Sequence, residues 1–314
     1  MITYVLCTER ASSDELALDR TSGLQSGLMS RVLVTAALGN VGSEVARECT
    51  ERGLTVRAAG LAEAELKARF PALESVRFDF LDRATWAGAL TGCDAVFLLR
   101  PPPLGDMDAT LNPFVDAAYA AGARHIVFLS VAGADRMKWV PHRKVELHLA
   151  STGKAWTVLR PGFFAQNLKD AYRRDIVEDG RLYVPAADGR VAFLDVRDAA
   201  EVAALIFEDP SAYQQKALTL TGPEAITFAR VAELLSGTLG KTIRYEPASI
   251  LGYIWHLRTK RKQSWMQVIV QTILHVGLRR GDAQAVEPTV EKLLGRPPRS
   301  LADYITRDAK VWRS

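Results

Sequence analysis

The chain has 314 residues, of which 48% are hydrophobic and 24% are charged, as is typical of a globular protein with one large domain. There are 40 lysines and arginines against 36 aspartates and glutamates, and so small an excess does not indicate a nucleic-acid-binding surface. The longest apolar stretch, 268–278, is interrupted by polar residues and is too short to cross a bilayer. We therefore expect no stably inserted membrane segment and no nucleic-acid partner.

The cysteine and histidine pattern indicates neither disulfides nor a metal site. Cys7, Cys49 and Cys93 are far apart and odd in number, and the five histidines do not cluster with cysteines or acids in a ligand spacing. The first residues lack the basic start and sustained apolar run of a signal peptide. The simplest interpretation is a protein of a reducing, cytoplasmic compartment.

The folded domain is expected to begin at Met29. Residues 1–28 show no periodicity, whereas the sequence from Met29 onward, MSRVLVTAALGNVG, begins with an apolar strand pattern. We interpret 1–28 as a flexible N-terminal extension and 29–314 as a single domain.

Strand and helix patterns then alternate along the chain. Strands are predicted at 31–35, 55–59, 76–80, 95–99, 125–130 and 157–160, and helices at 42–53, 84–90, 112–121 and 144–152. This alternation, with nearly continuous apolar strands, predicts an α/β fold: a Rossmann-type, doubly wound parallel sheet.

The regular alternation ends near residue 160. Strands are predicted at 191–196 and 217–221, helices at 227–239 and after Pro297, and a helical, basic segment over 247–281. We expect a core of about 29–160 plus 190–222, and a smaller, mostly helical C-terminal substrate lobe of about 161–189 and 223–314.

A glycine turn follows the first strand. Gly39 and Gly42 fit the last two glycines of a G-x-x-G-x-x-G pattern, with Ala36 at the first position. Between a strand and a helix, such glycines let the backbone approach a pyrophosphate and leave helix N–H groups free to bind it. The alternative is that these glycines serve only the tight turn.

The second strand gives no clear cofactor preference. An acidic residue at its end favours NAD and an arginine favours NADP, but this strand ends without an acid. Arg57 lies nearby, within the strand, and could recognise the cofactor or point elsewhere.

Several segments, in order, resemble the NmrA-like family of atypical short-chain dehydrogenases. The resemblance covers about residues 30 to 310 and is carried by VLVTAALGNVG, FDFLD (78–82), GCDAVFLLRPP (92–102), ARHIVFLSVAGA (123–134), WTVLRPGFFAQN (156–167), FLDVRDAAEVAA (193–204) and LTLTGPEAITFARVAELLSGTLGKTIRY (218–245).

The resemblance implies a fold that binds NADP or NAD, with Asp79 beside the adenine and the fourth strand under the cofactor. The candidate cofactor residues are Thr35, Leu38, Gly39, Asn40, Val41, Gly42, Arg57, Asp79, Phe80, Leu98, Leu99, Arg100 and Pro161. The family includes nicotinamide-dependent reductases and non-catalytic cofactor sensors. Ala36, and Leu61 where its NADP binders commonly have arginine, depart from the family pattern and weaken the expected binding.

The proton donor of short-chain dehydrogenases is absent, because none of the eight tyrosines has a lysine four residues later. Ser130 ends the fifth strand and could hydrogen-bond a substrate carbonyl, or could cap the turn. Lys144 could donate a proton near a nicotinamide ring, as its spacing resembles that of related ether reductases, or could be a solvated helix residue. His142 could act as acid or base, or could only begin the helix.

The basic segment stands apart from these motifs. Residues 247–281 contain six arginines and lysines and no acid, together with apolar residues at helical spacing. Its basic loop could meet an anionic substrate or a membrane surface, or could be a solvated face.

Two functional hypotheses follow. The first is an NAD(P)-dependent reductase of a small carbonyl, quinone-like or aromatic compound, with a non-redox enzyme as a variant. The second is a dinucleotide sensor that regulates a partner. The expected partner is a small-molecule substrate, and a homodimer is left open.

Overall fold

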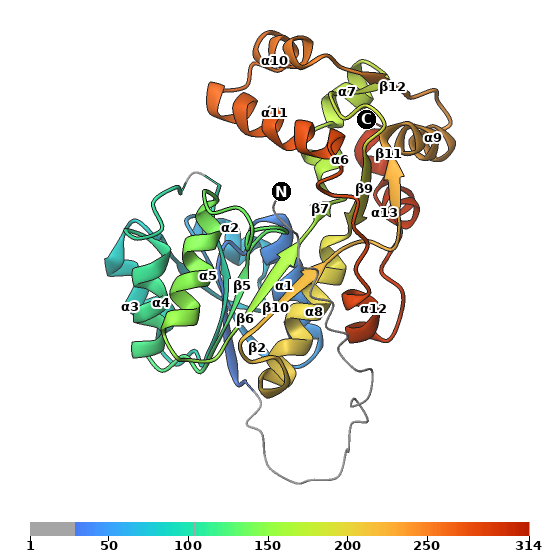
Figure 1. The fold of residues 1–314 in the computed structure, drawn as a ribbon. Helices are drawn as coiled ribbons and strands as arrows, with labels where there is room; N and C mark the ends of the chain where they lie inside the picture. Colours follow the sequence, from blue (N-terminus) through green and yellow to red (C-terminus); the bar gives the residue numbers. More distant parts are fainter. Residues whose placement is uncertain (1–28, 103, 314) are drawn as a thin grey trace, which may run out of the picture.

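The computed structural model describes residues 29–102 and 104–313, so the predicted extension at 1–28 lies outside the described residues. Seven parallel strands form the central sheet in the order β10-β6-β5-β4-β1-β2-β3. Their bounds are β1 Arg31–Val34, β2 Thr55–Gly60, β3 Glu74–Arg77, β4 Ala95–Leu99, β5 His125–Leu129, β6 Trp156–Pro161 and β10 Lys216–Leu220. The doubly wound parallel sheet predicted from the sequence is confirmed (Figure 1).

Helices cover both faces of the sheet, which is why its strands read as continuous apolar runs. On one face, α1 (Asn40–Glu51), α2 (Glu63–Arg69) and α8 (Val196–Glu208) pack with the strands into one apolar cluster. On the other face, α3 (Trp86–Leu90), α4 (Leu111–Ala120) and α5 (Pro141–Ser151) form a second cluster. Strand order reverses between β1 and β4, and at such a reversal doubly wound folds bind ligands beyond the carboxyl ends of the strands.

The C-terminal lobe is built around two small sheets. One sheet joins β7 (Phe163–Phe164), β9 (Arg190–Leu194) and β11 (Ala225–Thr227), and the other pairs β8 (Arg181–Val184) with β12 (Arg244–Pro247). Its helices are α6 (Asn167–Asp170), α7 (Arg173–Glu178), α9 (Phe228–Leu239), α10 (Ile250–Thr259), α11 (Trp265–Arg279) and α13 (Leu301–Arg307). Figure 1 shows α10 and α11 at the end of the lobe.

The boundary between core and lobe differs from the predicted one at two points. Strand β9, assigned to the core from the sequence, pairs with β7 and β11. Helix α12 (Thr289–Leu294), assigned to the lobe, places Val290 in the cluster with α1 and α8. Local pattern does not tell which sheet a short strand joins, because pairing is decided by tertiary packing.

The chain is fastened to the core again near its end. Arg296 donates to Asp198 (2.8 Å) and Glu201 (2.6 Å) on α8, and Arg299 pairs with the same two carboxylates. Asp198 is fully buried, so these guanidinium groups supply the charge that a buried carboxylate requires. The segment after α12 is thereby held against the core helix.

Candidate functional site

The turn between β1 and α1 forms the base of the candidate site. Ala36 has a φ of 52°, in the left-handed region that glycine adopts without strain. This explains physically why the pattern has glycine at this position. The alanine therefore carries a conformational cost in this chain, on the order of 1–2 kcal/mol.

Gly42 is required by close packing within the same turn. A Cβ atom on Gly42 would overlap the carbonyl oxygen of Ala36, whereas one on Gly39 would lie 3.2 Å from it. Gly39 caps α1 without any side-chain hydrogen bond to the helix. The N–H groups of the first turn, at Asn40 to Gly42, have no acceptor within the helix, which is the property that lets a helix start bind an anion.

Thr35 has a structural role in joining two strands. Its hydroxyl donates to the Phe97 carbonyl (3.0 Å) and accepts from the Leu99 amide (2.9 Å), which ties β1 to β4 at the strand reversal. Thr35 is completely buried. The glycine turn is therefore anchored to the strand beside it.

Four further predicted cofactor residues differ in how far their side chains are exposed. Leu98 and Phe80 are buried in the apolar cluster beneath α3, α4 and α5, where Phe80 packs edge-on against Phe78 and Phe114. Asp79 follows β3 instead of lying within it, and its carboxylate accepts from the Leu81 amide (2.9 Å). Pro161 ends β6, and its carbonyl accepts from Ala132 (2.9 Å). Among these four, only Asp79 is half-exposed, whereas Leu98, Phe80 and Pro161 are buried.

The side chain of Arg57, a predicted cofactor residue, is turned away from the glycine turn. The Arg57 guanidinium donates to the carbonyls of Ala89 (2.8 Å) and Thr91 (2.7 Å) at the end of α3, and pairs with Glu74 (2.7 Å) at the start of β3. These partners lie at the amino edge of the sheet, opposite the glycine turn. Arg57 is buried and fastens α3 to the sheet.

Arg100 and His142 meet beside the carboxyl ends of β4 and β5. Arg100 Nε donates to His142 Nε2 (3.3 Å), and its Nη1 donates to the carbonyls of Pro102 (3.1 Å) and Leu104 (2.5 Å). Because Nε2 accepts, the proton of neutral His142 is on Nδ1. Burial, together with the charge of Arg100, lowers the pKa of His142 to about 4, so the ring is neutral at physiological pH.

The Nδ1–H of His142 is a buried donor with no acceptor among the described residues. A buried donor left unpaired costs about 1–3 kcal/mol unless a ligand or water accepts from it. His142 tilts against Phe128, at 6.2 Å between ring centroids, which fixes the ring over the end of β5. His142 thus presents an unpaired buried donor near the carboxyl ends of β4 and β5.

Ser130 belongs to a buried polar cluster that the sequence did not reveal. Its hydroxyl donates to Glu146 Oε1 (2.6 Å), and Arg160 donates to both carboxylate oxygens (3.1 and 2.7 Å). Arg143 also approaches Glu146 (3.4 Å). Glu146 stands four residues after His142, so both side chains lie on one face of α5. That spacing was the available signal for Glu146.

Lys144 lies away from this cluster. Its side chain is 56% exposed and pairs with Asp108 (2.7 Å) on the loop before α4. The Asp108 carboxylate raises the pKa of Lys144, which keeps the ammonium group protonated. The structure therefore supports the solvated alternative for Lys144 and does not bring it to His142.

A pocket of about 380 Å³ lies beside the glycine turn, between core and lobe. Core residues Leu38 and Asn40 face lobe residues Gln166 and Lys169 across it. Asn40 also donates to Asp170 of α6 (2.5 Å), so the first residue of α1 touches the lobe directly. The glycine turn is thus enclosed by the lobe on one side.

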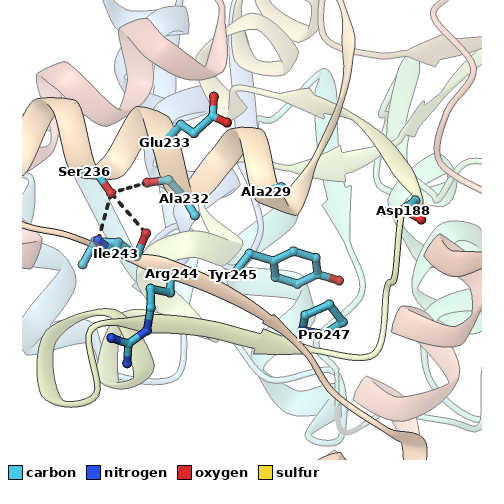
Figure 2. A pocket seen from close by; sticks show the side chains of 9 residues that line it. All are labelled: Asp188, Ala229, Ala232, Glu233, Ser236, Ile243, Arg244, Tyr245 and Pro247. Carbon is cyan, nitrogen blue, oxygen red and sulfur yellow. Dashed lines mark hydrogen bonds between the residues drawn. The ribbon is translucent and has the colours of Figure 1, made fainter.

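A larger hollow, of about 650 Å³, lies in the lobe between α9 and β12 (Figure 2). Its polar side chains are largely engaged: the Ser236 hydroxyl bonds Ala232 and Ile243, and Tyr245 donates to Ala187 (2.9 Å). It contains neither the glycine turn nor the Ser130 cluster. We therefore place the candidate active site at the carboxyl edge of the central sheet.

One group of described residues has metal-like geometry, formed by Asp175, Asp179 and His256. Arg261 already occupies it, donating to Asp175 and to Asp179 (2.6 Å), while His256 bonds Asp175 (2.8 Å). The guanidinium supplies the positive charge that this acidic group needs. We interpret the cluster as a clamp between α7 and the loop after α10.

The parallel sheet, the open glycine turn at the strand reversal and the polar cluster beside it define a Rossmann-type fold of the dinucleotide-binding class. The sequence profile of the NmrA-like family matches residues 29–300, and the chain belongs to that family.

Its relatives include reductases. The chain is 32% identical to an NAD(P)H azoreductase of Xenophilus azovorans, covering 90% of this chain and 99% of the relative. It is also 32% identical to a (4-alkanoyl-5-oxo-2,5-dihydrofuran-3-yl)methyl phosphate reductase of Streptomyces griseus, with the same two coverages.

Solved structures share the fold. The triphenylmethane reductase of Citrobacter sp., complexed with NADP(H), superposes with a TM-score of 0.78 at 19% identity, over 88% of this chain and 99% of that one. An NADPH-dependent quinone oxidoreductase of Escherichia coli gives 0.76 at 24% identity, over 88% and 98%. In the part of the chain that the structure describes, no helix combines the length and apolar character needed to cross a membrane.

Proposed function

We propose that the chain is an NAD(P)H-dependent reductase of a small carbonyl, quinone-like or aromatic compound. The observation that carries this proposal is the start of α1 at the strand reversal: Gly42 packs against Ala36, and Gly39 caps the helix with no side chain over its first turn. This arrangement suits a pyrophosphate, which needs close backbone approach and N–H donors. The azoreductase and phosphate reductase relatives support a reductive reaction.

A reduced nicotinamide, when bound there, supplies a hydride to the substrate. The chain's own contribution is to orient the acceptor group and stabilise the charge that develops on it. His142 does this through Nδ1–H, a neutral donor in a buried position, which can polarise a carbonyl or azo group without transferring its proton. The proton that completes the reduction comes from solvent in this scheme.

Ser130 is proposed to accept a hydrogen bond from an N–H or O–H group elsewhere on the substrate, because its own proton is not available to a substrate carbonyl. Its hydroxyl hydrogen points to Glu146, so the lone pairs of the oxygen are what it offers to a ligand. Glu146 and Arg160 hold this hydroxyl in place, and they act through Ser130 without touching the substrate themselves. Lys144 has no role in this scheme.

The test is a fluorescence titration with NADPH and NADH, followed by a turnover assay with a quinone and an azo dye. NADPH is the first cofactor to test, because β2 ends without an acidic residue. We expect micromolar binding, and we expect Gly42→Ala to abolish it because the new methyl group overlaps the Ala36 carbonyl. Ala68→Gly on exposed α2 is the matched control and should bind like the parent chain.

Each outcome separates the hypotheses. Binding with turnover supports the reductase. Binding without turnover of any tested acceptor favours a dinucleotide sensor. Absence of binding at millimolar concentrations of all oxidised and reduced forms contradicts both, and leaves a non-redox enzyme on the same fold.

A further inference from the structure

The α10–α11 hairpin exposes a large apolar surface that the proposed reaction does not use. We define the hairpin face by its exposed apolar side chains: Leu251, Trp255, Trp265, Met266, Ile269, Val270, Ile273 and Leu274. Exposures range from 44% for Leu274 to 78% for Leu251. Contiguous exposed apolar surface of this kind usually marks an interaction site.

Helix geometry places this surface on one side of α11. The exposed residues recur as adjacent pairs every four positions, at 265/266, 269/270 and 273/274, which is one broad helical face. The opposite side carries Val268, His275 and Leu278, which are buried in the lobe cluster. Half of the helix therefore anchors it to the lobe, and the other half is free to meet a partner.

Positive charge surrounds the hairpin face. Arg258, Lys260, Lys262, Arg279 and Arg280 lie in or beside the two helices, and residues 248–281 contain no aspartate or glutamate. None of these five cations forms an ion pair with any residue of 29–102 or 104–313. The cations thus have charge available for an anionic partner.

Two of these cations contact tryptophan rings near the turn between α10 and α11. Arg258 lies over the ring of Trp265 (4.8 Å to its centroid), and Lys260 lies over Trp255 (6.0 Å). Tryptophan combines an apolar ring with a polar N–H and is favoured at membrane–water interfaces. Lysine and arginine can lie along apolar surface with their charged ends in the aqueous layer.

We propose that the hairpin face docks peripherally on an anionic phospholipid surface. The apolar half of α11 enters the boundary between headgroups and acyl chains, and the surrounding cations pair with lipid phosphates. A second copy of the chain is a poorer occupant, because a two-fold interface centred on this face would bring its unpaired cations together. Docking in this way needs no spanning helix.

The test is sedimentation of the full-length chain with vesicles of phosphatidylcholine, with and without phosphatidylglycerol. We expect binding to the anionic vesicles only, weakening as salt is added because the headgroup attraction is screened. Lys260→Glu and Lys262→Glu should each reduce the partition coefficient by at least about fivefold, the factor expected for one cation near a charged bilayer. Ile269→Ser with Ile273→Ser should abolish it.

Matched controls lie elsewhere on the surface. Leu147→Ser removes a leucine that is 53% exposed on α5, and Lys292→Glu with Lys310→Glu reverses two exposed cations outside the hairpin. These variants should bind like the parent chain. Circular dichroism and the urea midpoint show whether each variant is folded.

Three results would overturn the proposal. The first is equal binding of parent and hairpin variants, and the second is no binding to anionic vesicles at low salt. The third is a dimer in sedimentation velocity that Ile269→Ser with Ile273→Ser converts to monomer, since the face would then be covered by a second copy. None of these results depends on whether the chain is a reductase.

Discussion

Ser130 Oγ donates a 2.6 Å hydrogen bond to Glu146 Oε1, so the hydroxyl that ends β5 is held by a carboxylate of α5. Arg160 at the end of β6 completes the contact. Strand ends and helix are thereby locked to one another beside the proposed substrate position.

Replacing Glu146 by alanine should destabilise the fold strongly. The side chain of Glu146 is 4% exposed, and that of Arg160 is 16% exposed. Removing one partner of a buried ion pair leaves the other charge uncompensated, so we expect the free energy of unfolding to fall by about 3–5 kcal/mol. Urea unfolding measures it. Glu233→Ala, which removes an exposed pair with Arg230, should cost less than about 1 kcal/mol; equal losses in the two variants would contradict a buried role for Glu146.

His142 variants test the proposed donor. His142→Phe should lower kcat by about 100-fold or more, because a preorganised donor to the developing charge is lost. His142→Asn places an amide near the Nδ1 position and should retain more activity than His142→Gln. Cofactor binding should change little in all three. His148→Asn, on the same helix and paired with Asp116, is the matched control.

The same histidine gives a pH prediction. Burial lowers the pKa of His142 to about 4, so the ring stays neutral from pH 6 to 8. The turnover rate should therefore be independent of His142 titration over that range. An activity profile with an inflection between pH 6 and 7 that disappears in His142→Asn would show that the ring ionises during the reaction.

Ala36→Gly should relieve backbone strain at the glycine turn. The left-handed φ of 52° costs an alanine about 1–2 kcal/mol, while glycine lowers stability by about 0.5–1 kcal/mol through the entropy of the unfolded chain. We expect a small net stabilisation and tighter NADPH binding. Ala68→Gly, in exposed α2, should instead destabilise by up to about 1 kcal/mol. Loss of stability in both variants would show that Ala36 is not strained.

Acid should weaken the lobe through His275. Its ring is buried between Tyr172 (2.5 Å to Nε2) and Tyr253 (3.5 Å to Nδ1), and burial lowers its pKa to about 4. The unfolded histidine, with a pKa near 6.5, binds more protons between these two values, so stability falls as pH decreases through this window. The loss is on the order of 3 kcal/mol by pH 4.

Urea unfolding at several pH values checks this. His275→Gln should be less stable than the parent at pH 7.5, and the difference should shrink toward pH 4. Leu147→Ser, which removes an exposed side chain of α5 that does not titrate, should keep a constant difference from the parent over the same range. A constant difference for His275→Gln would rule out the proposed linkage.

The fold was predictable because its signals are local and repeated. Continuous apolar strands, the glycine turn and the alternation of elements sufficed for the parallel sheet. The sequence did not predict helix α2 or the two-residue strand β7, because both are too short to show a periodic pattern. Strand β3 was placed two residues late, since Phe78 and Phe80 are apolar but follow the strand.

The site was less predictable because direction and pairing are tertiary properties. Arg57 looked available from its position in β2, yet its side chain reaches the amino edge of the sheet. Lys144 and His142 are two residues apart on α5, and only the histidine turns inward. Glu146 was not predicted as a site residue, because an acidic residue in a helix is usually solvated. Its partner Arg160 is brought to it only by the fold.

The chain passes between sheet and lobe several times, and this connectivity limits how the lobe can be exchanged during evolution. The chain enters the lobe after β6, returns for α8 and β10, leaves again through β11, and comes back with α12 before α13. The arginines after α12 then fasten it to α8. No single cut releases the lobe as a continuous piece. Recombination cannot easily exchange it between relatives, so new substrate preferences are expected to accumulate as individual substitutions and loop-length changes.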